Sequence, residues 1–176
     1  MGIVVSISGI DGVKKALESL DVNIKKEVSN EINASALRIQ NSAKRLAPVN
    51  FGQLRNGISL TRNNNYTFTV ESKASYSPYV EFGTGGKVSV PADFQSYAMQ
   101  FKGGKGGKFA DMIAALTLWV KRKGIGNGKN EKNIAFLIAR SILQKGMRPQ
   151  PFLIPAFEQE KPLLIKRIKE LLDVKS

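Results

Sequence analysis

Apolar and polar positions alternate along the N-terminal third of the chain with the period of a long helix. From Ile24 to Leu46, apolar or small residues recur every three or four positions, so they share one stripe of a helix of about six turns. Asp21 is expected to cap this helix, because a short side-chain oxygen can accept from the free amides of its first turn. Pro48 is expected to end it, since the residue before a proline avoids the helical region. The stripe consists of Ile24, Val28, Ile32, Ala36, Ile39, Ala43 and Leu46.

Shorter alternations on either side of this helix predict strands. Residues 3–8 are rich in β-branched side chains, and Asp11 is placed to cap a helical turn that runs through Leu20. Residues 58–60 and 66–70 alternate around Asn63-Asn64-Asn65, which predicts a hairpin because asparagine tolerates a left-handed backbone. A further strand is expected at 79–82, between Pro78 and a glycine-rich turn.

The C-terminal half is predicted to be mainly helical. One helical face runs from Phe109 to Val120, with Trp119 at its edge, and the basic residues before Gly124 are expected to end that helix. A second helix is expected at 131–145, through Ile134, Leu137, Ile138 and Ile142, with Gly146 as its stop. The last helix is expected at about 156–173; its apolar stripe begins at Leu163, so Pro162 either lies near its start or kinks it.

These elements predict an α+β fold in which a small antiparallel sheet of three to four strands packs against the long N-terminal helix. Strands this short need a helix across one face to be stable. The whole chain, 1–176, is expected to be one domain with additional helices in its C-terminal half. A basic elaboration rich in glycine and lysine is expected at about 87–146.

Composition removes most kinds of catalytic chemistry. The chain has 176 residues with neither histidine nor cysteine, so a Ser/His/Asp triad, a thiolate nucleophile and a His- or Cys-bearing metal site are all excluded. The spacings of its glycines fit neither the phosphate-binding loop nor the dinucleotide-binding pattern. We expect no cofactor, no bound metal and no enzymatic activity. The sequence also lacks the long apolar run of a membrane helix and the features of a secretory signal, which predicts synthesis in a cytoplasm and no membrane partner.

The net charge of +13 is concentrated in one part of the chain. Residues 101–150 carry 11 basic and two acidic residues, together with a cluster of glycines. This composition predicts two solvated, mobile loops, at 102–108 and 123–132, and either contact with a polyanion or a solubilising role would explain them. The basic residues that would face DNA or a neighbouring subunit are Lys102, Lys105, Lys108, Lys121, Arg122, Lys123, Lys129 and Lys132.

Carboxylates in the central part of the chain are few and widely separated. Glu81 differs from the rest, because it is a single acid among apolar neighbours. It could form a salt bridge with an arginine, or it could face solvent from a strand.

Three segments, in this order, resemble the tail-component family of tailed bacteriophages typified by the HK97 gp10 protein. Residues 47–58 read APVNFGQLRNGI, residues 76–85 read YSPYVEFGTG and residues 149–156 read PQPFLIPA. The sequence departs from the family pattern at Asn50-Phe51, where Asp-Thr is usual, and its region 87–146 is longer than in compact members. The motif positions are Pro48, Gly52, Leu54, Arg55, Tyr79, Val80, Glu81, Phe82, Gly83, Thr84, Pro151, Phe152, Leu153, Pro155 and Ala156.

The resemblance implies a structural virion protein in the neck or tail-completion region. Members of this family assemble as a ring at the head–tail junction, so the implied partners are copies of this chain, the adjacent head-closure or connector and tail proteins, and genomic DNA in the channel. Prolines 149, 151 and 155 are expected to hold the segment before the last helix extended. Phe152 then serves either core closure, which we favour, or docking on a neighbouring subunit. A free-standing basic DNA-binding protein that acts through the lysines of 102–132 is the alternative function.

Overall fold

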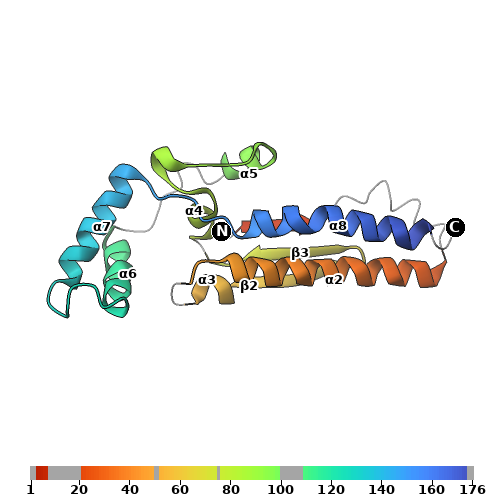
Figure 1. The fold of residues 1–176 in the computed structure, drawn as a ribbon, viewed down its shortest axis with the longest axis horizontal. Helices are drawn as coiled ribbons and strands as arrows, with labels where there is room; N and C mark the ends of the chain where they lie inside the picture. Colours follow the sequence, from red (N-terminus) through yellow and green to blue (C-terminus); the bar gives the residue numbers. More distant parts are fainter. Residues whose placement is uncertain (1–2, 8–20, 50–51, 75, 100–108, 174–176) are drawn as a thin grey trace. The chain divides into compact units, whose positions relative to one another are not determined.

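The computed structural model describes residues 3–7, 21–49, 52–74, 76–99 and 109–173, and the other residues are drawn in grey (Figure 1). The chain divides into two compact units. The first unit consists of Met1–Ser77 with Pro151–Ser176, and the second of Pro78–Gln150. The predicted basic elaboration at about 87–146 falls inside the second unit.

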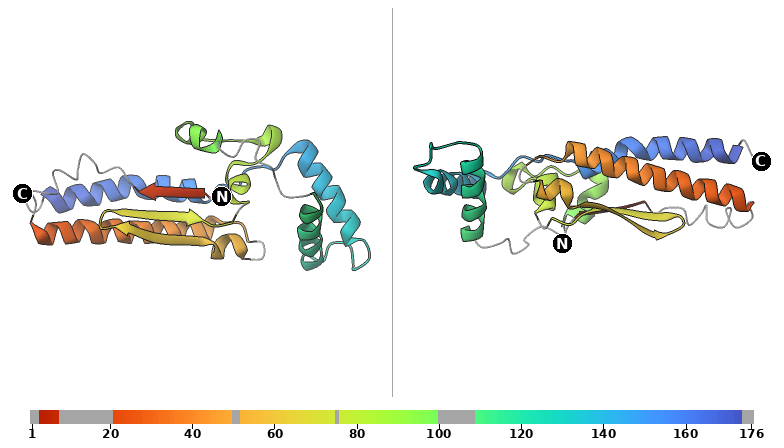
Figure 2. Two further views of the ribbon diagram at one scale, coloured as in Figure 1. Left: turned by 180° about the vertical axis from the view of Figure 1, so that it is seen from behind. Right: turned by 90° about the horizontal axis from the view of Figure 1, so that it is seen from below.

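The first unit is a layer of two helices packed on a three-stranded sheet. Its helices are α2 (Val22–Leu46), the short α3 (Gln53–Asn56) and α8 (Leu153–Asp173), and its strands are β1 (Ile3–Ile7), β2 (Ile58–Asn64) and β3 (Thr67–Ser72). Figures 1 and 2 show α2 and α8 side by side and antiparallel, with the sheet against them. The strand order is β1-β3-β2 and both pairings are antiparallel. The predicted α+β class is confirmed.

Helix α2 begins and ends close to where its sequence predicts. The backbone N–H of Asn23 donates to Asp21 Oδ1 at 2.7 Å, so the expected cap is present. The predicted stripe is buried from Ile24 to Ala43, and it forms most of the first unit's core with Phe68, Val70 and Phe152. Leu46 is the exception, since 44% of it is exposed. It lies in the last turn, next to Pro48, where the chain leaves the packed face.

The sheet contains the predicted hairpin and the predicted N-terminal strand. Leu60 lies opposite Val70, and Phe68 and Val70 face the core from β3. Tyr66 lies in the turn and not in the strand, because β2 extends through Asn64. The helical turn predicted after Asp11 falls outside the described residues.

The strand predicted at 79–82 is wrong, because this segment is the helix α4 (Ser77–Phe82). Four residues, of which Tyr79, Val80 and Phe82 are apolar or aromatic, are too short a run to separate a strand from a helical turn. Pro78 favours the helix, since its fixed φ suits the first turn and its missing N–H leaves no broken bond there. The third strand of the sheet is β1.

The second unit also contains the short α5 (Gln95–Met99), α6 (Phe109–Arg122) and α7 (Glu131–Lys145). The bounds of α6 and α7 confirm the predicted helices. In α7, however, the buried residues are Ala135 and Ala139, whereas Leu137 is 62% exposed. Alanines at spacing i, i+4 let α6 approach closely, so the larger side chains beside them stay outside.

Helix α8 begins at Leu153, earlier than predicted, and contains both Pro155 and Pro162. Pro155 lies in the first turn, where backbone N–H groups have no helical partner. Pro162 is on the exposed face, so water can satisfy the carbonyl that its missing N–H leaves free. The segment predicted to be extended therefore ends at Phe152.

Candidate interaction surfaces

The first motif turns the chain from α2 into the sheet. Gly52 has φ +70°, a left-handed conformation that glycine adopts without strain, and its carbonyl accepts from the N–H of Asn56 at 2.7 Å. The turn of α3 that follows buries Leu54 and leaves Arg55 partly exposed on the opposite side. Asn50 and Phe51, where the sequence departs from the family pattern, lie outside the described residues.

The second motif begins in the first unit and continues into the second. Partial burial raises the pKa of the Tyr76 hydroxyl, and a hydrogen bond with the backbone of Leu54 offsets part of that increase. The hydroxyl of Ser77 accepts from the N–H of Ile3 at 3.2 Å. Glu81 is 1% exposed, so a solvent-facing position for it is wrong.

The glycine-rich end of the second motif packs against the segment that follows α7. Thr84 N–H donates to the Met147 carbonyl at 2.9 Å, and Met147 N–H donates to Thr84 Oγ1 at 2.8 Å. The Lys87 ammonium donates to the Gly146 carbonyl at 3.2 Å. A Cβ on Gly146 would lie 2.0 Å from the Thr84 carbonyl oxygen. Residues 83–87 and 146–147 therefore form one tightly packed joint.

The third motif closes the core of the first unit. Phe152 and Leu153 are fully buried, and Ile154 and Ala156 are nearly so. The preferred role of Phe152, core closure, is therefore confirmed. Seven of the fifteen motif residues are buried, whereas Arg55 is partly exposed.

The basic residues singled out from the sequence do not all fall on described parts of the chain. Lys102, Lys105 and Lys108 lie outside the described residues. Lys121 and Arg122 are in the last turn of α6, Lys132 is in the first turn of α7, and Lys123 and Lys129 lie between the two helices. The five described side chains are exposed. Whether they contact DNA or protein stays a prediction.

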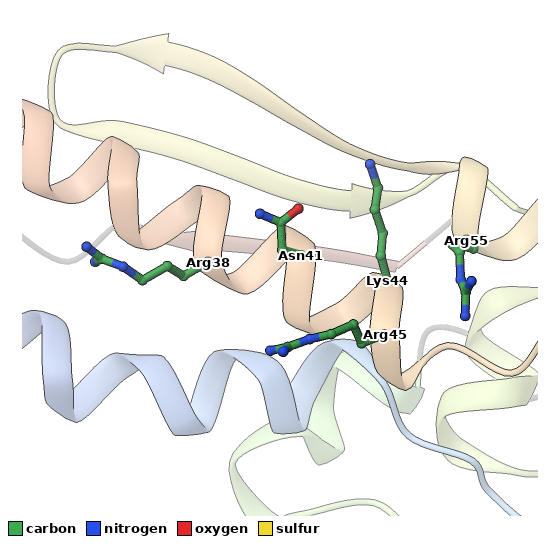
Figure 3. Close-up of a pocket in the computed structure, with 5 residues that line it drawn as sticks. All are labelled: Arg38, Asn41, Lys44, Arg45 and Arg55. Carbon is green, nitrogen blue, oxygen red and sulfur yellow. The ribbon is translucent and has the colours of Figure 1, made fainter.

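A second basic site lies in the first unit, and sequence reasoning did not single it out. It is a hollow of about 570 Å³ at the C-terminal end of α2, and its described lining consists of Arg38, Asn41, Lys44, Arg45 and Arg55 (Figure 3). Arg38, Asn41 and Arg45 have spacing i, i+3, i+7, which places them on one helical face. That spacing could have indicated a polar face on α2 from the sequence alone. The full basic site could not be recognised, because Arg55 comes beside this face only through the turn at Gly52.

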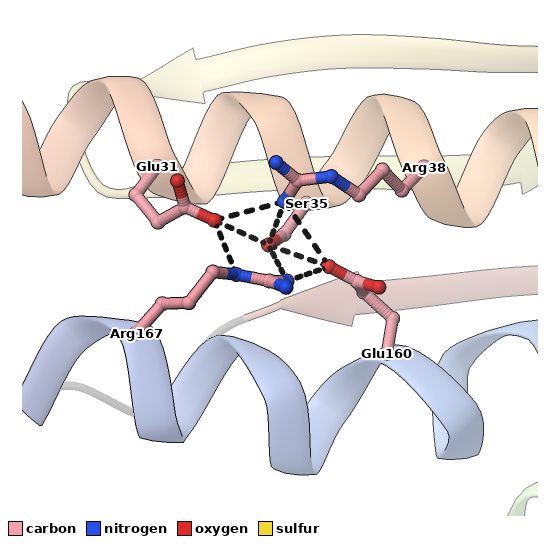
Figure 4. A network of polar contacts seen from close by, with 5 residues as sticks. All are labelled: Glu31, Ser35, Arg38, Glu160 and Arg167. Atoms are coloured by element: carbon pink, nitrogen blue, oxygen red, sulfur yellow. Dashed lines mark hydrogen bonds and ion pairs between the residues drawn. The ribbon is translucent and has the colours of Figure 1, made fainter.

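A polar network holds α2 against α8 near this hollow (Figure 4). Arg167 Nε lies 2.7 Å from Glu31 Oε1 and its guanidinium also contacts Glu160, while Arg38 Nη1 lies 2.8 Å from Glu31 and 3.3 Å from Glu160. Ser35, which is fully buried, donates to Glu160 at 2.9 Å. The hydrogen bond with Glu31 raises the pKa of Arg38, so the guanidinium stays charged. Two acids and two arginines thus balance in charge at one helix–helix contact.

We predict that Arg167→Ala lowers the free energy of unfolding by about 2 kcal/mol, because Glu31 and the buried Glu160 then share Arg38 alone. Urea unfolding followed by circular dichroism measures the loss. Lys166→Ala is the matched control, since Lys166 makes an exposed i,i+4 pair with Glu170 at 3.8 Å and its loss should cost less than about 0.5 kcal/mol. Equal effects of the two changes would contradict the prediction.

The acidic side chains and the helices of the described residues bear on metal binding and on membrane insertion. They contain no cluster of three or more Asp or Glu side chains that could hold a metal ion. None of their helices is both long enough and apolar enough to cross a membrane.

Part of the chain matches the model of a known protein family. Residues 11–83 match the model of the family described as "Bacteriophage HK97-gp10, putative tail-component". The range contains the first motif and most of the second, whereas the third lies outside it. No curated protein and no solved structure matches the chain. Over residues 11–83, this match confirms the family predicted from the motifs.

Proposed function

Because residues 11–83 match the HK97 gp10-like family of phage tail components, we propose that this protein forms a ring at the head–tail junction through which DNA passes. The family match is the observation that carries this proposal. A tail component is a structural part of the virion, and we accordingly propose no catalytic activity. Copies of this chain would form the ring, and head-closure or connector proteins and tail proteins would lie next to it.

The exposed apolar side chains of the second unit support a role in assembly. On α6 and α7, Leu118, Leu137 and Leu143 are 58%, 62% and 65% exposed. Contiguous exposed apolar patches are typical of protein contact surfaces, and we propose that these leucines belong to such patches. A ring requires head-to-tail contacts that close by rotation, so each copy must offer two different surfaces.

Deletion of the gene from the phage genome tests the proposal. We expect particles with filled or partly emptied heads that lack attached tails, and an infectious titre lower by several orders of magnitude. Negative-stain electron microscopy of the particles measures the first and plaque counts the second. Supplying the wild-type chain from a plasmid should restore both. Normal tailed, infectious virions without the protein would contradict the proposal.

A ring can be tested on the wild-type particle. Cryo-electron microscopy should show the helix pair α2–α8 repeated around the tail axis at the junction. Density for one copy only, or at the distal tail tip, would contradict the ring while leaving the tail-component assignment intact.

A further inference from the structure

We infer that the basic hollow of the first unit, lined by Arg38, Asn41, Lys44, Arg45 and Arg55, binds the phosphate backbone of DNA. The inference rests on the proposed function and deepens it: the polyanion that this hollow binds is the DNA that passes through the proposed ring. It assigns the contact to the α2–α3 surface, whereas the sequence directed attention to the lysines of 102–132.

Three of the four cations of the hollow have no ion-pair partner among the described residues. Four of its five described lining residues are cationic and none is acidic. Among the described residues, no carboxylate lies within ion-pair distance of Lys44, Arg45 or Arg55, and the Nε of Arg55 is buried without a hydrogen-bond partner. Arg38 is engaged by Glu31 and Glu160, so it contributes less to the free charge. An anion from outside the chain would neutralise the charges of Lys44, Arg45 and Arg55.

The geometry fits a repeating anion better than a single small one. Arg38 and Arg45 are seven residues apart on α2, which separates their Cα atoms by about 10 Å along the helix axis. Charges distributed over such a length can contact successive phosphates of one strand, and guanidinium groups can each bind a phosphate in bidentate fashion.

The composition of the lining favours nucleic acid over a protein segment. A peptide-binding groove normally offers apolar pockets for anchoring side chains. The described lining of this hollow is instead four cations and one amide, the residue types that contact phosphate and sugar. Helix capping explains part of the arrangement, since Lys44 and Arg45 lie in the last turn of α2 and complement its dipole. It does not explain Arg55, which comes from α3.

The test compares two Lys-Arg pairs at two helix ends. Lys44-Arg45 end α2 and Lys121-Arg122 end α6, so replacing either pair by Gln-Gln removes two charges from a last helical turn. Fluorescence anisotropy with a labelled duplex of arbitrary sequence measures the affinity of the full-length chain between 50 and 200 mM salt, as is usual for such contacts. Thermal unfolding checks that both variants are folded.

We expect Lys44→Gln with Arg45→Gln to weaken binding about tenfold at low salt and to make the slope of log K against log salt less steep by about two, one for each lost phosphate contact. Lys121→Gln with Arg122→Gln should change both by much less. Arg55→Gln alone should reduce the slope by about one.

Several results would overturn the inference. These are no binding of duplex by the wild-type chain, equal losses in the two double variants, and binding of polyglutamate as tight as that of duplex, which would point to an acidic protein partner. None of these results depends on the particle experiments. Tailed virions without the protein would contradict the proposed function. An unchanged affinity for duplex DNA in the Lys44/Arg45 variant would contradict only this inference.

Discussion

Gly146→Ala should unfold much of the second unit, with a loss of roughly 3 kcal/mol or more in its free energy of unfolding. Gly146 has φ +72°, and a Cβ there would lie 2.0 Å from the Thr84 carbonyl oxygen and 3.3 Å from Gly85 Cα. Both neighbours are backbone atoms, so neither can rotate away. Relief would require separating the joint and breaking the two hydrogen bonds between Thr84 and Met147.

Two glycines of the same unit provide graded controls for this change. Gly124 has a similar φ of +65° but open space at its Cβ position, so Gly124→Ala should cost only the strain of a left-handed backbone, about 1 kcal/mol. Gly86 has open space and no positive φ, so Gly86→Ala should have an effect within about 0.5 kcal/mol. The single tryptophan, Trp119, lies in α6 and reports unfolding of this unit by fluorescence. Similar costs for Gly146→Ala and Gly124→Ala would show that the joint is loose.

Hydrophobic periodicity was sufficient to predict the long elements. The stripe of α2 extends over about six turns, and only a helix satisfies so many positions at once, so its bounds and its buried face could both be read from the sequence. The bounds of α7 were fixed by a terminal glycine that could be recognised in the same way. Short elements lack this redundancy. At 79–82 the residue types favoured a strand, but the local effect of Pro78 and tertiary packing selected the helix α4.

The candidate sites were predictable to the extent that they are local in sequence. The three motifs were found because each is a contiguous run, and the family match over residues 11–83 confirms the assignment for the part of the chain that contains the first motif and most of the second. The basic hollow combines residues of α2 with Arg55, and the partnership depends on the turn at Gly52 bringing α3 beside the helix end. Net charge by segment concealed it, because the acids of residues 1–50 offset most of the basic residues there, including Arg38, Lys44 and Arg45, in the sum. The described lining of the hollow, by contrast, contains no acid. The folded surface, and not the segment total, determines where charge is available.

Phe152→Ala should destabilise the first unit by about 3–5 kcal/mol, which is the usual cost of removing a fully buried aromatic ring. Phe152 is 0% exposed and comes directly before α8, beside Leu153 and Ile154, which are also buried. The cavity would therefore open where α8 enters the core. Phe152 is buried at the start of α8, in the core that α2 also lines, so its loss should also weaken the pairing of the two helices. The network of Glu31, Arg38, Glu160 and Arg167 depends on that pairing.

Urea unfolding followed by circular dichroism measures the loss, and hydrogen exchange of peptides from α2 and α8 locates it. Phe157→Ala is the matched control in the same helix, since Phe157 is only half-buried and contacts Lys161 on its outer side, and we expect it to cost less than half as much. Phe152→Leu keeps most of the buried volume and should recover most of the stability. If Phe152→Ala instead left stability unchanged but reduced attachment of tails, the Phe152 side chain would act mainly in docking on a neighbouring subunit. The burial of the whole side chain within one copy predicts the opposite order of effects, with stability lost first and assembly lost only as a consequence.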